Sequence, residues 1–214
     1  MSAAPTRRIS AAEYLELDRA AGERFQYYRG EMFAMAGGTK NHNRIGRNLL
    51  VSLENRFRQK LRRCEAFSSD MRVRVDAEKL YTYPDVTVVC GPPEFLDKRE
   101  DTLLNPVVVI EVLSPSTEHF DRGSKFEMYR NLVSLHEYVL IAQHKTLVER
   151  FLREVDGSWK LTLADNLAGQ LELASIDVTL PLSEIYFDVD FPPAPLEQPS
   201  ELKAPDFDES NRPY

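Results

Sequence analysis

Residues 106–113 read PVVVIEVL and are followed by SPST at residues 114–117. A near-unbroken run of Val and Ile is typical of a strand that is covered on both faces of a sheet. Two other apolar runs, VTVVC at residues 86–90 and HEYVLIA at residues 136–142, have the same character. We therefore expect these three segments to be core strands of one β-sheet.

Signals for a short helix and a hairpin precede these strands. The sequence SAAE that starts at Ser10 is a capping box, and it predicts a helix over residues 11–20. Residues 25–29 and 31–35 flank Gly30 and predict the two arms of a hairpin.

A long helix is predicted to begin near Asn41, because apolar residues recur at every fourth position from there. These positions are Ile45, Leu49, Leu53, Phe57 and Leu61. The other expected elements are a helix at 122–132, a helical turn at 182–186, and strands at 66–69, 71–75, 147–153, 159–163 and 172–180. This order predicts an α/β or α+β domain with a mixed β-sheet flanked by helices.

The composition indicates one folded domain with an appended tail. A chain of 214 residues with 43% hydrophobic residues can fill one core, which we place at residues 1–190. Residues 191–214 hold six of the 13 prolines and a net charge of −3, which favours an extended or disordered tail. The apolar runs are far shorter than the roughly 20 residues of a membrane span, and the N-terminus lacks the apolar stretch of a secretion signal.

Cys64 and Cys90 are the two cysteines, and they do not make a disulfide framework. We interpret both as core thiols and expect a reducing, cytoplasmic location. The sequence has no C-x-x-C or H-E-x-x-H pattern, so it offers little support for a zinc site.

Positive charge is concentrated in one segment of an acidic chain. The formal net charge of −7 by itself argues against a nucleic-acid partner, but residues 40–74 hold ten basic and three acidic residues. Because salt screens distant charges, a local basic stripe can still attract phosphates. The candidates for contacts with a DNA backbone are Arg44, Arg47, Arg56, Arg58 and Arg62. The alternative is a solvated helix face without a ligand.

Glu111 is a charged residue inside the apolar run. An ionised carboxylate in a covered strand is costly unless a metal ion, a lysine or an arginine compensates it. Asp85 lies at the mouth of the run at residues 86–90, and the two carboxylates converge if the two strands are neighbours. Two carboxylates with water and a phosphate oxygen make a natural Mg²⁺ site. The alternatives are a turn aspartate at position 85 and a buried ion pair at position 111.

Such a site needs a third group that orients the attacking water or stabilises charge. Lys125, in the helix that follows Glu111, is the candidate, although most helix lysines are solvated. Asp121, near the start of this helix, is a candidate cap rather than a participant in the chemistry.

Several short motifs carry a resemblance to a known family. They are YRGE at residues 28–31, Met35 with His42, YPDV at 83–86, VIEVLSPST at 109–117, DRGSK at 121–125 and EY at 137–138. Over about residues 10–190 the chain resembles the Uma2 family, also called DUF820, of restriction-endonuclease-like proteins. That family is similar to the PD-(D/E)XK nucleases. The run IEVLSPST, with PD upstream, carries most of the specificity.

The resemblance implies a mixed sheet flanked by helices and Mg²⁺-dependent hydrolysis of phosphodiester bonds, with Mn²⁺ as a substitute cation. It implies Asp85 and Glu111 as metal ligands and the backbone carbonyl of Val112 as a further ligand. The nuclease motif has lysine two residues after the glutamate, where this chain has Leu113. In this family the lysine is moved to Lys125, from which a long side chain can reach the same point.

Glu31 and His42 also match the family motifs. Glu31 follows the Gly30 turn and is a candidate outer ligand of the metal, and His42 is a candidate to contact a phosphate or to act as a base. The alternatives are an exposed hairpin acid and an ordinary histidine at the start of a helix.

Three functional hypotheses follow. The first is a metal-dependent DNA endonuclease, expected to be a homodimer because cutting two strands takes two sites. The second is a non-catalytic nucleic-acid-binding or assembly module that keeps the nuclease fold, which Leu113 and the net charge of −7 favour. The third is a structural protein in which an arginine pairs with Glu111. The site chemistry and the resemblance together favour the first.

Overall fold

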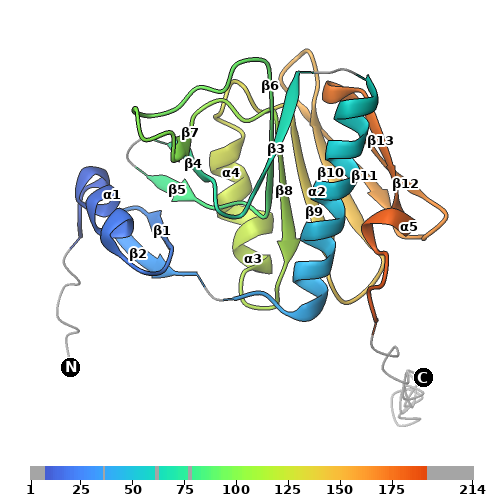
Figure 1. Cartoon of the computed structure of the whole chain (residues 1–214), viewed down its shortest axis with the longest axis horizontal. Coiled ribbons are helices and arrows are strands. Elements are labelled where there is room, and N and C mark those ends of the chain that lie inside the picture. Colours follow the sequence, from blue (N-terminus) through green and yellow to red (C-terminus); the bar gives the residue numbers. More distant parts are fainter. Residues whose placement is uncertain (1–7, 36, 61–62, 77–78, 192–214) are drawn as a thin grey trace, which may run out of the picture.

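A six-stranded mixed sheet forms the centre of the molecule (Figure 1), in a computed structural model that describes residues 8–35, 37–60, 63–76 and 79–191. Its strands, in spatial order, are β11 (Trp159–Ala164), β10 (Val148–Arg153), β9 (Glu137–Ala142), β8 (Val108–Leu113), β6 (Val86–Cys90) and β3 (Cys64–Ser68). β8 and β9 run parallel, and the other neighbours run antiparallel. The three predicted core strands β6, β8 and β9 are adjacent, as their apolar sequences favour.

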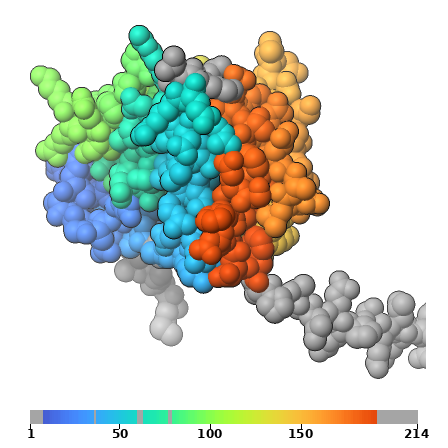
Figure 2. Space-filling model, turned by 45° about the vertical axis from the view of Figure 1, so that its right-hand side comes forward, coloured from blue at the N-terminus to red at the C-terminus, as the bar shows by residue number. Residues whose placement is uncertain are grey.

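Helices cover both faces of this sheet. One face carries α2 (Lys40–Lys60), α5 (Leu182–Ile185) and the hairpin of β12 (Gln170–Leu173) and β13 (Val178–Pro181). Figure 2 shows α2 and α5 side by side at the surface. The other face carries a helical stretch made of α3 (Glu118–Phe120), the π-helical turn η1 (Asp121–Lys125) and α4 (Phe126–Tyr129).

The alternation of side chains along β8 decides which layer each residue meets. Ile110 and Val112 belong to the apolar core beneath α2. Val109 and Leu113 belong to the core that includes α4. Because successive side chains of a strand point to opposite faces, Glu111 points toward η1 and α4.

A second sheet is built mainly from the N-terminal part of the chain. Its strands, in spatial order, are β2 (Glu31–Ala34), β1 (Phe25–Tyr28), β5 (Leu80–Thr82), β4 (Arg72–Asp76) and β7 (Thr102–Leu103). β1 and β2 are the predicted hairpin, and Gly30 in its turn has a φ of 94°, which glycine adopts at little steric cost. The predicted helix α1 (Ala11–Ala20) is confirmed with Ser10 as its N-cap, since the Ser10 side chain accepts the Glu13 N–H.

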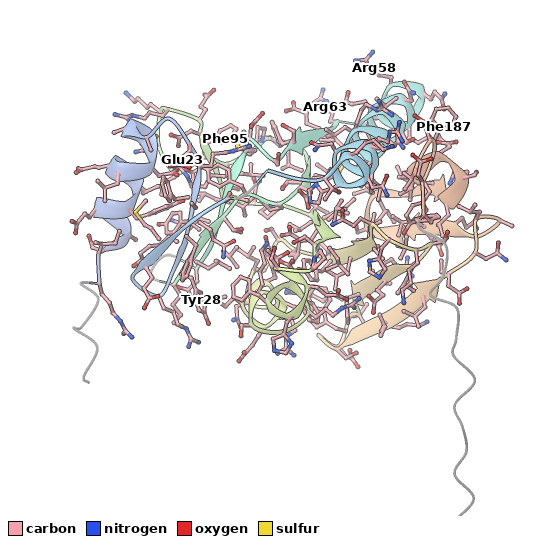
Figure 3. All side chains as sticks on the ribbon, turned by 90° about the horizontal axis from the view of Figure 1, so that it is seen from below. Glu23, Tyr28, Arg58, Arg63, Phe95 and Phe187 are labelled. Carbon is pink, nitrogen blue, oxygen red and sulfur yellow. A yellow bond between two sulfur atoms is a disulfide. The ribbon has the colours of Figure 1, made fainter. Side chains whose placement is uncertain are left out.

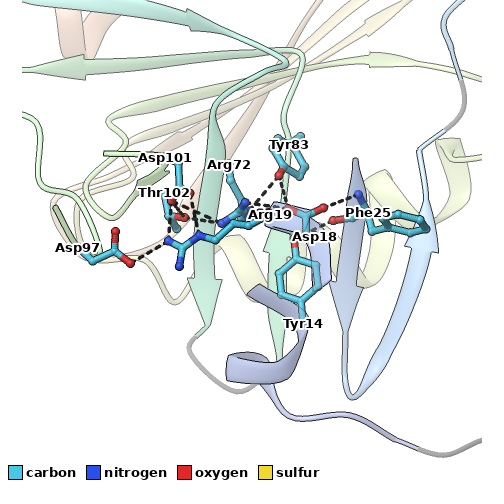
Figure 4. Close-up of polar contacts among 9 residues, drawn as sticks. All are labelled: Tyr14, Asp18, Arg19, Phe25, Arg72, Tyr83, Asp97, Asp101 and Thr102. Atoms are coloured by element: carbon cyan, nitrogen blue, oxygen red, sulfur yellow. Dashed lines mark hydrogen bonds and ion pairs between the residues drawn. The ribbon is translucent and has the colours of Figure 1, made fainter. Parts of the chain in front are cut away.

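A buried polar network ties α1 to the segment that leads into Asp85 (Figure 4). The Asp18 carboxylate lies 2.7 Å from an Arg72 guanidinium nitrogen, accepts the Phe25 backbone N–H at 2.7 Å, and accepts the Tyr83 hydroxyl. Burial, together with the hydrogen bond to Asp18, raises the pKa of Tyr83 to about 12, so the hydroxyl keeps its proton at neutral pH. The network therefore fixes the start of β1 and the approach to Asp85 against the same helix.

Asp18→Ala is expected to lower the free energy of unfolding by about 3 kcal/mol, because it leaves the Arg72 guanidinium buried without its carboxylate. Urea unfolding followed by circular dichroism measures this loss. Asp97→Asn is the matched control, since Asp97 also pairs with an arginine of α1, Arg19 at 2.8 Å, but is exposed. Its unfolding midpoint is expected to stay at the wild-type value. An Asp18→Ala protein as stable as the wild type would contradict this role of the network.

Several boundaries differ from the sequence-based expectations. Residues 172–180 are not one strand, because the chain reverses through a 3₁₀ turn at Ala174–Ile176 with Asp177 at a φ of 51°. Aspartate tolerates this left-handed backbone better than most residues, a feature that the apolar pattern does not reveal. The helix predicted at 122–132 instead begins at Glu118 and ends at Tyr129. Strands β5 and β7 were not expected.

The expectation of two core thiols is wrong. The register of β3 and β6 places Cys64 directly opposite Cys90, and the two form a disulfide with their Cα atoms 4.0 Å apart. Their separation of 26 residues in the sequence gives no sign of this pairing, which depends on the register of two strands.

The apolar stripe of α2 is confirmed at the four predicted positions from Ile45 to Phe57, all buried, and Leu61 lies outside the described residues. The expected tail at residues 191–214 also lies outside them, except for Phe191, whose ring packs on Tyr186. Within the described ranges, no helix has both the length and the apolar character needed to cross a membrane.

Candidate active site

A cavity of about 770 Å³ lies between the β1–β2 hairpin and the central sheet, at the end of that sheet where β6 begins and β8 ends. Its walls come from segments far apart in the sequence: the hairpin, residues 37–39, the first turn of α2, the loop at residues 114–117, and α3 with η1. Five of the predicted site residues line it, namely His42, Asp85, Glu111, Val112 and Lys125.

Lys125 neutralises the buried Glu111 from the facing helix. Its ammonium nitrogen lies 2.7 Å from Glu111 Oε1 and 3.0 Å from Asp121 Oδ1. The Tyr129 hydroxyl donates to the same Glu111 oxygen at 3.2 Å. Because Asp121, Lys125 and Tyr129 follow one another at intervals of four residues, they share one side of the helical stretch. The acid that sequence reasoning treated as a cap is therefore a buried partner of Lys125.

Asp85 continues the pairing of β6 with β8 through its side chain. The backbone register pairs Val86 with Ile110. Asp85 directly precedes Val86, and its carboxylate accepts the Val112 N–H at 2.7 Å. The two carboxylate strands are thus neighbours, as the prediction of convergence requires. Asp85 therefore contacts the residue that follows Glu111, and both side chains line the cavity.

The buried groups of this cluster shift one another's pKa values. Burial raises the pKa of Glu111 above its usual range, Lys125 opposes this rise, and the charges of Asp121 and Asp85 add to it. Burial disfavours the charged form of Lys125, but Glu111 and Asp121 together hold the pKa of the ammonium group above its ordinary value. Lys125 is thus shared by Glu111 and Asp121, while His42 lies beside Asp85.

Comparison with known proteins identifies the family of this chain. The Uma2 family, described as "Putative restriction endonuclease", matches residues 11–183. The chain belongs to the Uma2 family. The expected resemblance is thereby confirmed.

The relatives of this Uma2 protein include two from Synechocystis sp., each named as an uncharacterized protein. The first, sll1609, is 40% identical over 76% of this chain and 90% of its own length. The second, slr1290, is 35% identical over 86% of this chain and 94% of its own length. A crystal structure described as a putative nuclease belonging to DUF820, from Anabaena variabilis, superposes with a TM-score of 0.68 at 16% identity, covering 83% of this chain and 97% of that one. This likeness confirms the nuclease-like fold of a mixed sheet flanked by helices.

The oxygen donors of the Uma2 site fit a hard divalent cation. Asp85 and Glu111 offer carboxylate oxygens, and the Val112 backbone carbonyl belongs to the same strand segment. In the described part of the chain, no three His, Cys, Asp or Glu side chains form a metal-binding group. Mg²⁺ suits such a set, because it is commonly held by one or two carboxylates and completes its shell with water and substrate phosphates.

His42 lies beside Asp85 at the start of α2. Its Nε2 is 3.4 Å from Asp85 Oδ2. Burial lowers the pKa of this imidazole, but Asp85, Glu111 and the Val112 backbone together raise it above the ordinary value. The charged imidazolium is thereby favoured, which suits contact with a phosphate oxygen better than action as a base.

Gly38→Ala is expected to lower the pKa of His42 toward its ordinary value. A Cβ at position 38 would lie 2.6 Å from His42 Nδ1, so the imidazole has to shift. A shift away from Asp85 weakens the interaction that raises the pKa of His42. Gly37→Ala is the matched control, because a Cβ there meets nothing within 4 Å. An NMR titration of the His42 ring protons measures both variants. Equal pKa values in the two variants would show that Gly38 does not position the ring.

The structure does not bring Glu31 to the carboxylates. Its side chain is exposed at the start of β2 and is not among the lining residues of the cavity. It lies directly opposite Tyr28 in the hairpin, so it shares a face with a residue that does line the cavity.

Two of the five arginines expected to contact DNA already pair with C-terminal acids. Arg44 lies 2.9 Å from Asp188 and 3.2 Å from Asp190, and Arg56 lies 2.7 Å from Glu184 of α5. These carboxylates reduce the positive field of α2 on the side that faces α5.

Two more of the candidate arginines, Arg47 and Arg58, do not line the cavity. Arg47 and Arg58 are exposed, and Arg62 lies outside the described residues. Figure 3 shows Arg58 at the far end of α2, on the other side of the molecule from Tyr28. DNA contact by these five arginines stays a prediction.

Two further residues hold the site together. Gln143, just after β9, donates from its amide to the Leu113 carbonyl at 2.8 Å and bonds to Thr39, so it ties the end of β8 to the segment before α2. Tyr129 lies one helical turn after Lys125, and that spacing was its only signal in the sequence.

Proposed function

We propose that this Uma2 protein is a Mg²⁺-dependent endonuclease that hydrolyses phosphodiester bonds of DNA. The supporting observation is that Asp85, Glu111 and Lys125 line one cavity, with Asp85 bonded to the Val112 N–H and Lys125 paired with Glu111. A buried group of acids with one lysine, in a cavity of a nuclease-like fold, matches the requirements of phosphodiester hydrolysis better than those of a structural core.

Asp85, Glu111 and the Val112 carbonyl are the groups that would hold Mg²⁺. When bound, the ion supplies charge neutralisation on the phosphate and lowers the pKa of a coordinated water. Lys125 stabilises negative charge that develops on the phosphate, because it stays protonated beside Glu111 and Asp121. His42 is placed to hold a phosphate oxygen through its imidazolium.

The alternative is a non-catalytic nucleic-acid-binding or assembly module that keeps the nuclease fold. Its main support was Leu113 at the usual position of the motif lysine. Leu113 is a buried core residue, and Lys125 brings an ammonium group to 2.7 Å from Glu111 instead. The cluster therefore has its lysine, which favours the catalytic proposal.

Removal of divalent metal is expected to abolish cleavage. The wild-type protein is incubated with supercoiled plasmid, linear duplex and single-stranded DNA in Mg²⁺, in Mn²⁺ and in EDTA, and the products are separated on gels. We expect nicking or cutting in both metals and none in EDTA. Intact DNA of every form in both metals would favour the non-catalytic module, and cleavage in EDTA would contradict a metal mechanism.

A homodimer and a cytoplasmic location stay predictions for this protein. Sedimentation equilibrium tests the first. Labelling of free thiols in freshly lysed cells tests the second, because a reducing compartment is expected to reduce the Cys64–Cys90 disulfide to two thiols.

A further inference from the structure

The cavity has two unlike walls. The carboxylates with Lys125 form one, and the other is apolar and aromatic, with Tyr28, Phe33 and Met35 from the hairpin and Phe120 from α3. Nothing in the proposed metal site requires an aromatic wall. A nucleotide offers both a phosphate and a flat base, so the two walls together suit its two halves.

Phe33 is the ring in this wall that is free to take a ligand. Its side chain is 46% exposed although it lines a cavity, and within the described residues it stacks on no other ring. Tyr28 is held edge-on against Phe120, with ring centroids 5.2 Å apart, and Arg29 lies over its ring. An exposed aromatic face beside a phosphate site is the usual platform for an unpaired base.

The depth of the charged group limits which DNA can reach it. Glu111 is 4% exposed and Lys125 is 5% exposed. A phosphate that contacts them has to enter the cavity, and its base then lies among the aromatic side chains. A paired base cannot follow, because its partner strand would have to enter as well.

Positive charge contributes little to binding inside the cavity. Of the described residues that line it, His42 and Lys125 are the basic ones, and three acids lie beside them. Affinity for a phosphate chain alone is therefore low, and base stacking has to supply much of the binding free energy.

We infer that the cavity binds a nucleotide of single-stranded DNA, with its phosphate at Asp85, Glu111 and Lys125 and its base stacked on Phe33. The inference rests on the proposed function and adds the substrate class. Unpaired segments, such as single strands, loops and flaps, are then the DNA forms on which the protein acts.

The test measures binding separately from cleavage. A fluorescein-labelled oligothymidylate and a duplex of equal length are titrated with the full-length protein in Ca²⁺, a divalent cation that can occupy the carboxylates in place of Mg²⁺, and fluorescence anisotropy gives the dissociation constants. We expect the single strand to bind about 10-fold more tightly than the duplex. Phe33→Ala is expected to weaken single-strand binding about 10-fold, and Phe33→Trp to restore it, since stacking needs an aromatic face rather than phenylalanine itself.

Phe187→Ala is the matched control. Phe187 is 68% exposed and lies near α5, well away from Tyr28 (Figure 3), so single-strand binding is expected to stay at the wild-type level. Equal affinity for both DNA forms, no binding of either, or a Phe33→Ala variant that binds like the wild type would overturn the inference. Metal-dependent cleavage by the wild type is scored in a separate assay, so the proposed function stands or fails independently of these results.

Discussion

Replacement of Glu111 by glutamine is expected to lower the rate of Mg²⁺-dependent DNA cleavage by about 10³-fold. The amide keeps the shape of the side chain and can still accept a hydrogen bond from Tyr129. It removes one negative charge and weakens the oxygen donor that Mg²⁺ prefers. Lys125 keeps Asp121 as a partner at 3.0 Å, so we expect the protein to remain folded. Initial rates of plasmid nicking, with circular dichroism as the folding check, measure the effect.

Glu137→Gln is the matched control for this variant. Glu137 is also a fully buried glutamate, on the neighbouring strand β9, but it is bonded to Ser175 and lies outside the cavity. The nicking rate of the Glu137→Gln protein is expected to stay within about twofold of the wild-type rate, because Glu137 is remote from the reacting phosphate. A Glu111→Gln protein that nicks as fast as Glu137→Gln would exclude Glu111 from the chemistry.

Lys125→Met is expected to lower both activity and stability. Cleavage should fall by about 10²-fold, because the charge next to the phosphate is lost. The free energy of unfolding should fall by about 3 kcal/mol, because Glu111 and Asp121 remain buried without their shared cation. Urea unfolding and nicking rates are measured on the same preparations.

A double variant separates these two effects. Asp121→Asn combined with Lys125→Met removes a carboxylate together with the lysine, so part of the stability is expected to return while cleavage stays low. Lys160→Met, at an exposed position of β11, serves as the control for loss of a lysine. Recovery of cleavage in the double variant would show that Lys125 acts on folding alone.

Local sequence patterns predicted most of the secondary structure. The Val and Ile runs of β6, β8 and β9 predicted central strands, because strands covered on both faces have little room for polar residues. The four-residue recurrence of apolar side chains predicted α2 and its buried stripe. The pattern failed at residues 172–180, where a 3₁₀ turn that ends at Asp177 reverses the chain.

The principal site residues were also recognisable from the sequence. Glu111 stands out because a carboxylate inside an apolar strand needs compensation, and that reasoning called for a cation such as Lys125. Asp85 stands out because it directly precedes another apolar strand, β6. Each of these signals depends on near neighbours in the chain, which the sequence displays directly.

Other features depend on which distant segments meet, and only the tertiary structure decided them. The disulfide between Cys64 and Cys90 follows from the register of β3 with β6. Asp121 became a partner of Lys125 instead of a cap because the helical stretch begins earlier and faces β8.

The surroundings of the site were likewise decided by packing. Arg44 pairs with two C-terminal acids 144 and 146 residues away. The aromatic wall with Phe33 exists because the hairpin of the second sheet lines the same cavity as residues of β8. The sequence by itself determined the central strands, the long helix and the charged residues of the site, because local periodicity and the cost of burying charge act at each position. The tertiary structure alone decided the partners of those residues and the shape of the cavity, because strand register and packing are properties of the whole chain.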